Sequence, residues 1–255
     1  MFFIVFITLL GIMHGYVGWK IFSGLNLNSS FAIIGIILLA ILTLLPVLPI
    51  LFRYNGYESS LLDKLSLIGY TSLGFFTLSF VAFLSKDLLF KVWGFISSFF
   101  SADVKQQITL DVDKREFLEK SLSIGILSLI GPTTAYGFYS ARKGPTIINQ
   151  DIYLKNLPDS FENFTIAQIS DLHVGPTIKK PYVEKVVNQI SNLNPDLIAI
   201  TGDMVDGSID YLRKDLEPLS QVVASHGTYF VTGNHEYYSG AERWLDETDR
   251  MGFTN

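Results

Sequence analysis

The sequence contains no cysteine and, within its first 52 residues, a single charged side chain, Lys20. The lack of cysteine excludes a disulfide framework, a thiolate metal site and a cysteine nucleophile. The scarcity of charge argues against a disordered chain and against a wholly soluble protein. It also leaves no basic surface of the kind that nucleic-acid-binding proteins use, so no nucleic-acid partner is expected.

Composition divides the 255 residues into two parts. Residues 1–143 carry 11 Lys and Arg against 8 Asp and Glu, a net charge of +3, together with 16 of the 20 Phe. Residues 144–255 carry 8 Lys and Arg against 16 Asp and Glu, a net charge of −8. Because the mean hydropathy of the whole chain is +0.34, high for a soluble protein, we expect an apolar membrane anchor followed by an acidic soluble domain.

The first part contains four uncharged stretches about as long as the ~20 apolar residues that a helix needs to cross a bilayer. These predicted spans lie near residues 2–19, 31–52, 65–85 and 121–141. They predict an α-helical membrane anchor over residues 1–143, with the lipid bilayer as its partner. Pro46 and Pro49 predict a kink in the second span. Residues 88–100 are too few to span and are predicted to lie in the membrane interface.

Four spans place the N-terminus, the second loop and everything after the fourth span on one side of the membrane. Seven Lys and Arg flank the spans on the other side, against four or five on this one. The positive-inside rule then predicts a multi-pass protein whose soluble domain is extracytoplasmic. Residues 114–120 (KREFLEK) resemble a twin-arginine export signal with an imperfect arginine pair. An ordinary charged start of a membrane helix is the alternative explanation.

The second part alternates short apolar runs with amphipathic segments. Strands are predicted at residues 164–170, 197–201 and 228–232, and helices near residues 181–193, 212–224 and 241–251. This alternation predicts a parallel sheet covered by helices on both faces. An additional edge strand is expected at residues 152–154, which leaves fewer than about ten residues as a short tether after the fourth span.

Polar residues follow each of the three main strands. They are Asp171 and His173 after the first strand, Asp203 and Asp206 after the second, and Asn234, His235 and Glu236 after the third. The carboxyl ends of parallel strands share one edge of a sheet, where ligands bind. A single Asp at such a place is usually a helix cap, but three coincidences at equivalent strand ends are improbable. Oxygen and imidazole ligands together favour Mn, Fe, Zn or Mg, so we expect a metal site here.

The motifs Asp171-x-His173, Gly202-Asp203-x-x-Asp206 and Gly233-Asn234-His235-Glu236, at steps of 32 and 31 residues, resemble those of the calcineurin-like metallophosphoesterases. Within that superfamily the chain is similar to the membrane-anchored bacterial branch. The resemblance covers residues 149–255. It implies an α/β metallophosphoesterase domain, here an incomplete β-sandwich flanked by helices.

The resemblance also implies roles for individual residues and two divalent metal ions as cofactors. Asp171 and His173 would bind the first ion, Asp203 would bridge both, and Asn234 would bind the second. His235 would be no ligand but would contact the phosphate and stabilise or protonate the leaving oxygen. Asp206 is expected to support the site or cap a helix, and Glu236 either orients His235 or is simply solvated.

Two cations that share a hydroxide can activate it and hold a phosphate in line for attack. We therefore expect a metal-dependent phosphoesterase that hydrolyses a phosphomonoester, phosphodiester or pyrophosphate bond, and the membrane anchor suggests a lipid-linked substrate. A four-span transporter is disfavoured because no predicted span contains a charged residue.

One departure from the family pattern concerns histidine. The family uses further histidines, including a Gly-His-x-His motif, and none follows His235 in this sequence. The chain is therefore expected to be the front part of a longer, C-terminally truncated protein. The alternative function is that of a catalytically incomplete membrane protein whose soluble part serves interaction or assembly.

Overall fold

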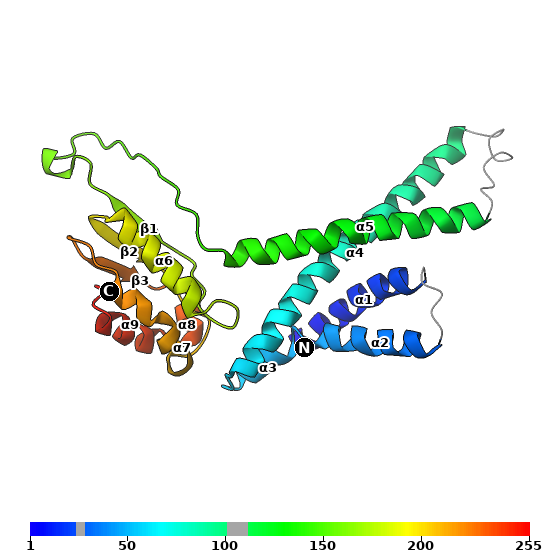
Figure 1. The fold of residues 1–255 in the computed structure, drawn as a ribbon, viewed down its shortest axis with the longest axis horizontal. Coiled ribbons are helices and arrows are strands. Elements are labelled where there is room, and N and C mark those ends of the chain that lie inside the picture. Colours follow the sequence, from blue (N-terminus) through cyan, green and yellow to red (C-terminus); the bar gives the residue numbers. More distant parts are fainter. Residues whose placement is uncertain (24–28, 101–111) are drawn as a thin grey trace. The chain divides into compact units, whose positions relative to one another are not determined.

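The computed structural model of the protein describes residues 1–23, 29–100 and 112–255. These residues form two compact units, each with its own hydrophobic core (Figure 1). The first unit comprises Met1–Tyr57 and Leu65–Phe138, and the second comprises Glu58–Lys64 and Tyr139–Asn255. The domain limits predicted above, 1–143 and 149–255, stay predictions.

Five helices make up the N-terminal part of the described chain. They are α1 (Phe2–Phe22), α2 (Ser29–Leu44), α3 (Leu48–Tyr54), α4 (Ser60–Phe100) and α5 (Val112–Arg142). Four helical stretches are long and apolar enough to cross a membrane: Phe3–Phe22, Ser29–Tyr54, Ser60–Phe99 and Phe117–Arg142. The predicted helical anchor with four candidate spans is thus confirmed.

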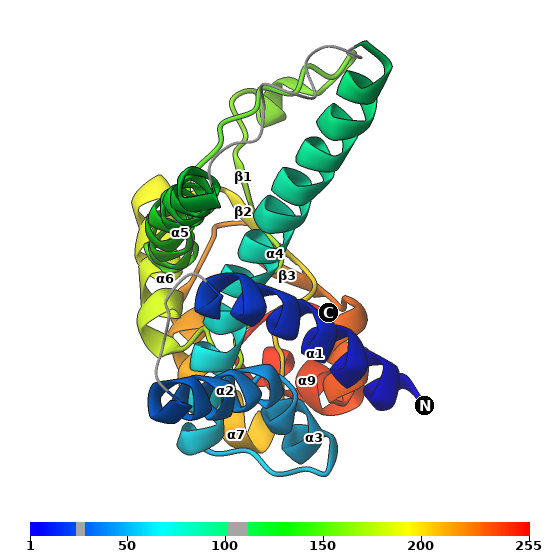
Figure 2. The ribbon, with the colours of Figure 1, turned by 90° about the vertical axis from the view of Figure 1, so that its right-hand side faces the viewer.

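The second candidate span is interrupted where the prolines predicted a kink. Helix α2 ends at Leu44 and α3 begins at Leu48, because Pro46 and Pro49 lack the amide hydrogen that a continuous helix needs. Helix α4, in contrast, runs without a break from Ser60 to Phe100 (Figure 2). Residues 88–100 continue α4 and form no separate helix, and their predicted position in the membrane interface stays a prediction. The predicted third loop includes residues 101–111, which lie outside the described residues.

Polar contacts join α1 and α4 within the first unit. Lys20 Nζ lies 2.5 Å from Asp87 Oδ2, which also accepts a hydrogen bond of 2.7 Å from the hydroxyl of Tyr16. The buried ring of His14 packs 4.2 Å from the ring of Phe76, measured between centroids. The polar groups of Lys20, Tyr16 and Asp87 are thus paired across helices, as apolar surroundings require.

The second unit is built around a parallel sheet of three strands in the order β1 (Ile166–Ile169), β2 (Leu197–Thr201), β3 (Thr228–Val231). The other elements are the helices α6 (Lys180–Leu193), α7 (Ile209–Leu216), α8 (Asn234–Ser239) and α9 (Ala241–Arg250) and the short 3₁₀ helices η2 (Asp159–Phe161) and η3 (Glu217–Gln221). The predicted alternation of strands and helices is confirmed.

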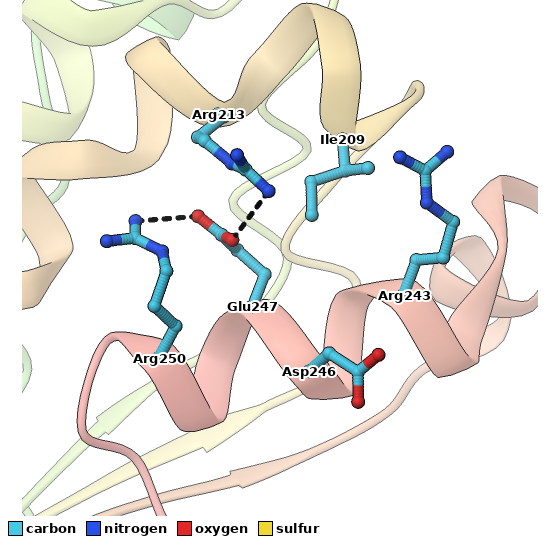
Figure 3. A pocket seen from close by; sticks show the side chains of 6 residues that line it. All are labelled: Ile209, Arg213, Arg243, Asp246, Glu247 and Arg250. Atoms are coloured by element: carbon cyan, nitrogen blue, oxygen red, sulfur yellow. Dashed lines mark hydrogen bonds and ion pairs between the residues drawn. The ribbon is translucent and has the colours of Figure 1, made fainter.

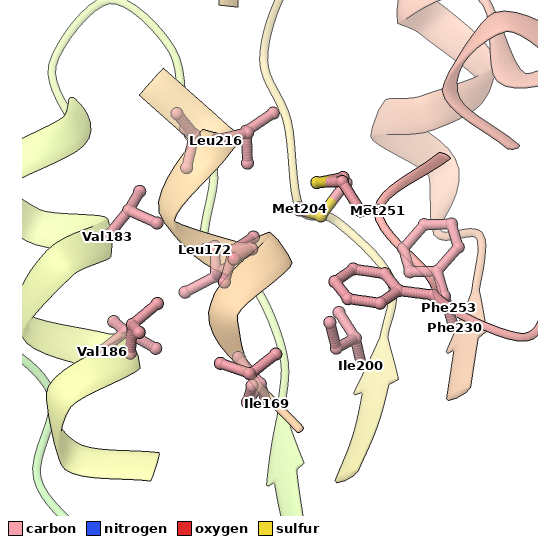
Figure 4. Packing of buried hydrophobic residues seen from close by; sticks show 14 of the residues in the cluster. Ile169, Leu172, Val183, Val186, Ile200, Met204, Leu216, Phe230, Met251 and Phe253 are labelled. Atoms are coloured by element: carbon pink, nitrogen blue, oxygen red, sulfur yellow. The ribbon is translucent and has the colours of Figure 1, made fainter. Parts of the chain in front are cut away.

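The core of this unit lies on one face of the sheet. Ile169, Ile200 and Phe230 occupy paired positions of the three strands and are buried against helical side chains such as Val186 and Leu216 (Figure 4). Alternate residues on the opposite face are exposed in this structure, with Val231 58% exposed. The expected covering of both faces is therefore not observed for the described residues.

The edge strand predicted at residues 152–154 is wrong. These residues belong to no strand or helix, and Tyr153 is 91% exposed. Helix α5 ends at Arg142 and β1 begins only at Ile166, so the segment between them is more than twice as long as expected. The apolar triplet alone cannot form a strand without a neighbour to supply hydrogen bonds.

Candidate metal site

The loops that follow β1 and β2 share an unusual backbone conformation. Asp171, His173 and Asp203 have φ angles of 56°, 46° and 52°, in the left-handed region. Asp and His are among the few residues other than glycine that adopt this region often. Such residues cluster at functional sites, where the surrounding contacts hold them in place.

Hydrogen bonds between the two loops continue the pairing of β1 with β2. The amide of Asp171 donates to the carbonyl of Gly202 over 3.2 Å, and the amide of His173 donates to the carbonyl of Asp203 over 3.0 Å. Gly202 has a φ of +84°, and a Cβ on it would lie 2.5 Å from the amide nitrogen of Gly233. Only glycine allows the β2 and β3 loops to approach this closely.

Three of the predicted site residues form a cluster that can hold a cation. One ligand atom each from His173, Asp203 and His235 lie within 4.8 Å of one another. The two imidazole rings meet edge to face with centroids 4.5 Å apart. Two imidazoles and a carboxylate form a donor set that suits the predicted divalent cations. The residues present therefore fit a divalent metal.

Asp206 supports both imidazoles of the cluster. Its Oδ1 atom accepts a hydrogen bond of 3.2 Å from Nδ1 of His173 and a very short one from Nδ1 of His235. When Nδ1 carries the proton, Nε2 carries the lone pair that binds a metal. A carboxylate behind a histidine is a common way to fix the orientation of a metal ligand.

Asp171 and Asn234 lie at the same edge of the sheet but outside this cluster. Oδ1 of Asp171 is 3.6 Å from Nε2 of His173, and the Asp171 side chain is 63% exposed. Asn234 is the first residue of α8 and is also exposed. The ligand roles that the resemblance implies for these two residues stay predictions.

Glu236 is fully buried, so the solvated environment considered for it is wrong. Its carboxylate accepts four backbone hydrogen bonds: 2.7 Å from Gly233, 3.0 Å from Asp203, 2.7 Å from Met204 and 3.3 Å from Val205. It therefore ties the loop after β2 to the loop after β3. Nothing in the sequence indicated its partners 31 to 33 residues earlier.

The electrostatic environment of His173 favours its protonated form when no metal is bound. Desolvation lowers the pKa of the imidazole, but the hydrogen bond with Asp206 and the charges of Asp206, Asp203 and Asp171 outweigh it. The pKa of His173 is therefore raised above its usual value. Because a metal ligand must be the neutral imidazole, protons compete with the metal at this residue.

We expect Asp206→Asn to lower the pKa of His173 in the metal-free chain, because it removes the largest favourable interaction with the imidazolium. NMR titration of the ring measures this change directly. The raised pKa stabilises the folded metal-free unit at pH values below about 6.5, the pKa of histidine in the unfolded chain. This stabilisation is lost as the pH rises through the pKa of His173 in the folded chain. Asp210→Asn, at an exposed carboxylate, is the control, and equal titration curves in the two variants would contradict the expectation.

A second charged cluster lies between α7 and α9, around a hollow of about 290 Å³ lined by Ile209, Arg213, Arg243, Asp246, Glu247 and Arg250 (Figure 3). Glu247 is 3% exposed and lies 3.1 Å from a guanidinium nitrogen of Arg213 and 2.7 Å from one of Arg250. Arg243 pairs with Asp210 over 2.8 Å. Because its arginines are paired with carboxylates, we interpret this cluster as an ion-pair network that packs the two helices together.

Residues 164–254 match the calcineurin-like phosphoesterase family. This part of the chain is a calcineurin-like metallophosphoesterase domain, as the three motifs predicted. No solved structure matches the chain.

Several curated proteins are similar to this chain. An uncharacterized metallophosphoesterase of Helicobacter pylori is 33% identical over 69% of this chain and 45% of its own length. A transmembrane protein with a metallophosphoesterase domain from Danio rerio is 36% identical over 46% of this chain and 27% of its own. The UDP-2,3-diacylglucosamine pyrophosphatase LpxG of Chlamydia trachomatis is 33% identical over 34% of this chain and 28% of its own. The chain thus spans less than half the length of each of these relatives.

Proposed function

We propose that the protein is a membrane-anchored, metal-dependent phosphoesterase that hydrolyses a phosphomonoester, phosphodiester or pyrophosphate bond. The observation that carries this proposal is the cluster of His173, Asp203 and His235 at the carboxyl ends of three parallel strands, with Asp206 bonded to both imidazoles. A phosphoesterase needs such a concentration of metal ligands on rigid strand ends.

Two divalent cations are part of the proposal, with Asp171 and His173 at the first, Asp203 between them and Asn234 at the second. Bound there, the cations supply Lewis acidity for the phosphate and lower the pKa of a water molecule. The Asp203 carboxylate would offset the repulsion between them. Its Oδ1 atom already accepts the amide hydrogen of His235 over 3.0 Å, which fixes the direction of the carboxylate.

His235 is proposed to contact the phosphate and to deliver a proton to the leaving oxygen. Its ring is held by the hydrogen bond from Nδ1 to Asp206, which points the opposite nitrogen away from that carboxylate. A positioned general acid of this kind typically contributes about 10²- to 10⁴-fold to a rate. The short distance between His235 and the other cluster members also suits a ligand role, and the experiment below separates the two roles.

We propose a lipid-linked phosphate ester or pyrophosphate as the substrate. Four candidate membrane helices precede the domain, and one relative is named as a pyrophosphatase of UDP-2,3-diacylglucosamine. A domain attached to the bilayer meets a lipid-linked substrate by diffusion in two dimensions. The excess of positive residues around the other loops supports an extracytoplasmic domain, which a C-terminal reporter fusion would test.

The test is hydrolysis by the full chain in detergent, with Mn²⁺, Fe²⁺, Zn²⁺ or Mg²⁺. The substrates are 4-nitrophenyl phosphate, bis(4-nitrophenyl) phosphate and a nucleoside diphosphate linked to a diacylated glucosamine. We expect metal-dependent turnover, fastest with the lipid-linked compound. Metal binding without turnover of any substrate would favour the interaction or assembly role, and absence of both would overturn the proposal.

Two variants assign the roles within the site. If His235 is a proton donor, His235→Ala should lower turnover while the chain binds as much Mn²⁺ as before. If His235 is a metal ligand, His235→Ala should lower the amount of bound Mn²⁺, as we expect for Asp171→Asn. Glu162→Gln, at an exposed carboxylate of the same unit, is the matched control.

A further inference from the structure

The segment Glu58–Lys64 includes the start of the third candidate membrane helix, Ser60–Phe99, yet it belongs to the same compact unit as the phosphoesterase domain. It comprises the end of a loop and the first turn of α4. Its two carboxylates, Glu58 and Asp63, contact residues about 150 positions later in the chain. Charge composition alone marks neither residue as part of the soluble domain.

Glu58 bonds to Ser208, the residue that immediately precedes helix α7. Ser208 stands at the N-cap of α7, and its own side chain makes no capping hydrogen bond. Instead, Oε1 of Glu58 accepts the amide hydrogen of Ser208 over 3.2 Å, and Oε2 accepts a very short hydrogen bond from its hydroxyl. A carboxylate at this end also interacts favourably with the helix dipole. A Cβ on Gly207 would lie 2.6 Å from Oε1 of Glu58, so a side chain there would obstruct the contact.

Asp63 makes a second attachment, to α7 and to the start of α6. It is 9% exposed, and its Oδ2 atom accepts a hydrogen bond of 2.8 Å from the hydroxyl of Tyr211. The same oxygen lies 2.9 Å from the ammonium group of Lys179, which also pairs with Asp215 on α7 over 3.3 Å. The Lys179 ammonium lies 4.5 Å from the centroid of the Tyr211 ring. A buried carboxylate with two polar partners indicates a specific contact between the segment and the domain.

The contact of Glu58 acts on the loop that carries two residues of the candidate metal site. This β2–α7 loop, residues 202–208, contains Asp203 and Asp206. At the beginning of the loop, Glu236 accepts the amide hydrogen of Asp203. In the middle of the loop, the amide of Asp206 donates to the carbonyl of Val174 over 2.8 Å. Glu58 holds its end, two residues after Asp206. The segment Glu58–Lys64 therefore supplies the attachment at the end of this loop.

Membrane topology is consistent with this contact. Four spanning helices place the loop between the second and third spans on the same side as the chain after the fourth span. The end of α5 is attached to the domain as well, because Nζ of Lys185 donates to the carbonyls of Arg142 and Lys143, each over 3.3 Å. The segment Glu58–Lys64 and the end of α5, which lie on the same side of the membrane, thus both contact α6 or α7. This holds for either orientation of the protein in the membrane.

We propose that residues 58–64 are a positioning element of the metal site, contributed by the membrane anchor. Glu58 sets the β2–α7 loop, and Asp63 fixes α7 against the start of α6. The site is then complete only while this segment contacts the domain. The docking of the segment is independent of the proposed function, whereas its effect on metal binding depends on it.

Cross-linking tests the docking without any assay of activity. The chain has no cysteine, so Glu58→Cys with Ser208→Cys introduces the only two thiols. A short bis-methanethiosulfonate reagent added to the full chain in membranes should link them, detected by mass spectrometry as joined tryptic peptides. The control pair is Glu58→Cys with Ser225→Cys, because Ser225 precedes β3 at the opposite edge of the sheet. Equal linking of both pairs, or linking of neither, would overturn the docking.

Mn²⁺ binding to the full chain, measured by electron paramagnetic resonance, tests the positioning. We expect Glu58→Ala to raise the dissociation constant about tenfold, the lower end of the effect of groups that orient metal ligands. Glu58→Gln should restore most of the affinity, because its amide still bonds to Ser208. Glu162→Ala is the control. Unchanged affinity in Glu58→Ala would overturn the positioning role even if the cross-link forms, and no Mn²⁺ binding by the unsubstituted chain would instead refute the proposed function.

Discussion

Replacing Asp203 by asparagine is expected to reduce both Mn²⁺ affinity and phosphoesterase turnover more than 100-fold. Asp203 is the only carboxylate in the three-residue cluster, and it comes from the central strand of the sheet. The substitution removes the negative charge that would hold two cations together. The asparagine side chain keeps the size of the aspartate side chain and one oxygen acceptor. Changes to groups that merely orient a metal ligand typically cost about 10- to 100-fold, so loss of a bridging ligand should cost more.

Mn²⁺ binding and hydrolysis of bis(4-nitrophenyl) phosphate measure this effect. Asp210→Asn is the control, because Asp210 is exposed and pairs only at the surface with Arg243. Circular dichroism of both variants should match that of the unsubstituted chain. Activity within threefold of the control would show that Asp203 is no metal ligand.

Replacing Glu236 by alanine is expected to lower the free energy of unfolding of the second unit by about 3–5 kcal/mol. The buried carboxylate accepts hydrogen bonds from four backbone amides, and alanine would leave these amides without an acceptor inside the protein. Domains are typically stable by only about 5–15 kcal/mol, so this loss would consume a large part of the total. Mn²⁺ affinity should fall with it, because the amide of Asp203 is one of the four.

Guanidinium unfolding followed by the fluorescence of Trp244, which is fully buried, measures this loss. The other two tryptophans, Trp19 and Trp93, are replaced by phenylalanine in all chains compared. Glu242→Ala is the control, since Glu242 is exposed in the first turn of α9 and should contribute at most about 1 kcal/mol through the helix dipole. A Glu236→Ala chain as stable as the control would show that water replaces the carboxylate at no cost.

Most of the secondary structure was predictable because it depends on neighbouring residues. The length of the uncharged stretches predicted four candidate spans, and Pro46 and Pro49 predicted the break between α2 and α3. The strand at residues 197–201 was predicted with its observed limits. The errors arose where a local pattern needs a distant partner: residues 152–154 have strand-like composition but no neighbouring strand.

The candidate site was predictable in its residue types but not in its connections. Spacing placed Asp171, His173, Asp203 and His235 at one edge of a sheet, because parallel strands end together. The bonds of Asp206 to both imidazoles, and the burial of Glu236 beneath two loops, depend on side-chain directions that spacing does not specify.

The sequence by itself determined that an apolar helical anchor precedes an acidic α/β domain with metal-binding strand ends, since hydropathy and residue periodicity are properties of neighbouring residues. Only the tertiary structure decided that Glu58, just before the third candidate membrane helix, and Asp63, in its first turn, belong to the same unit as that domain. The reason is physical: a hydrogen bond between residues about 150 positions apart leaves no periodic trace in the chain and exists only once both segments are folded.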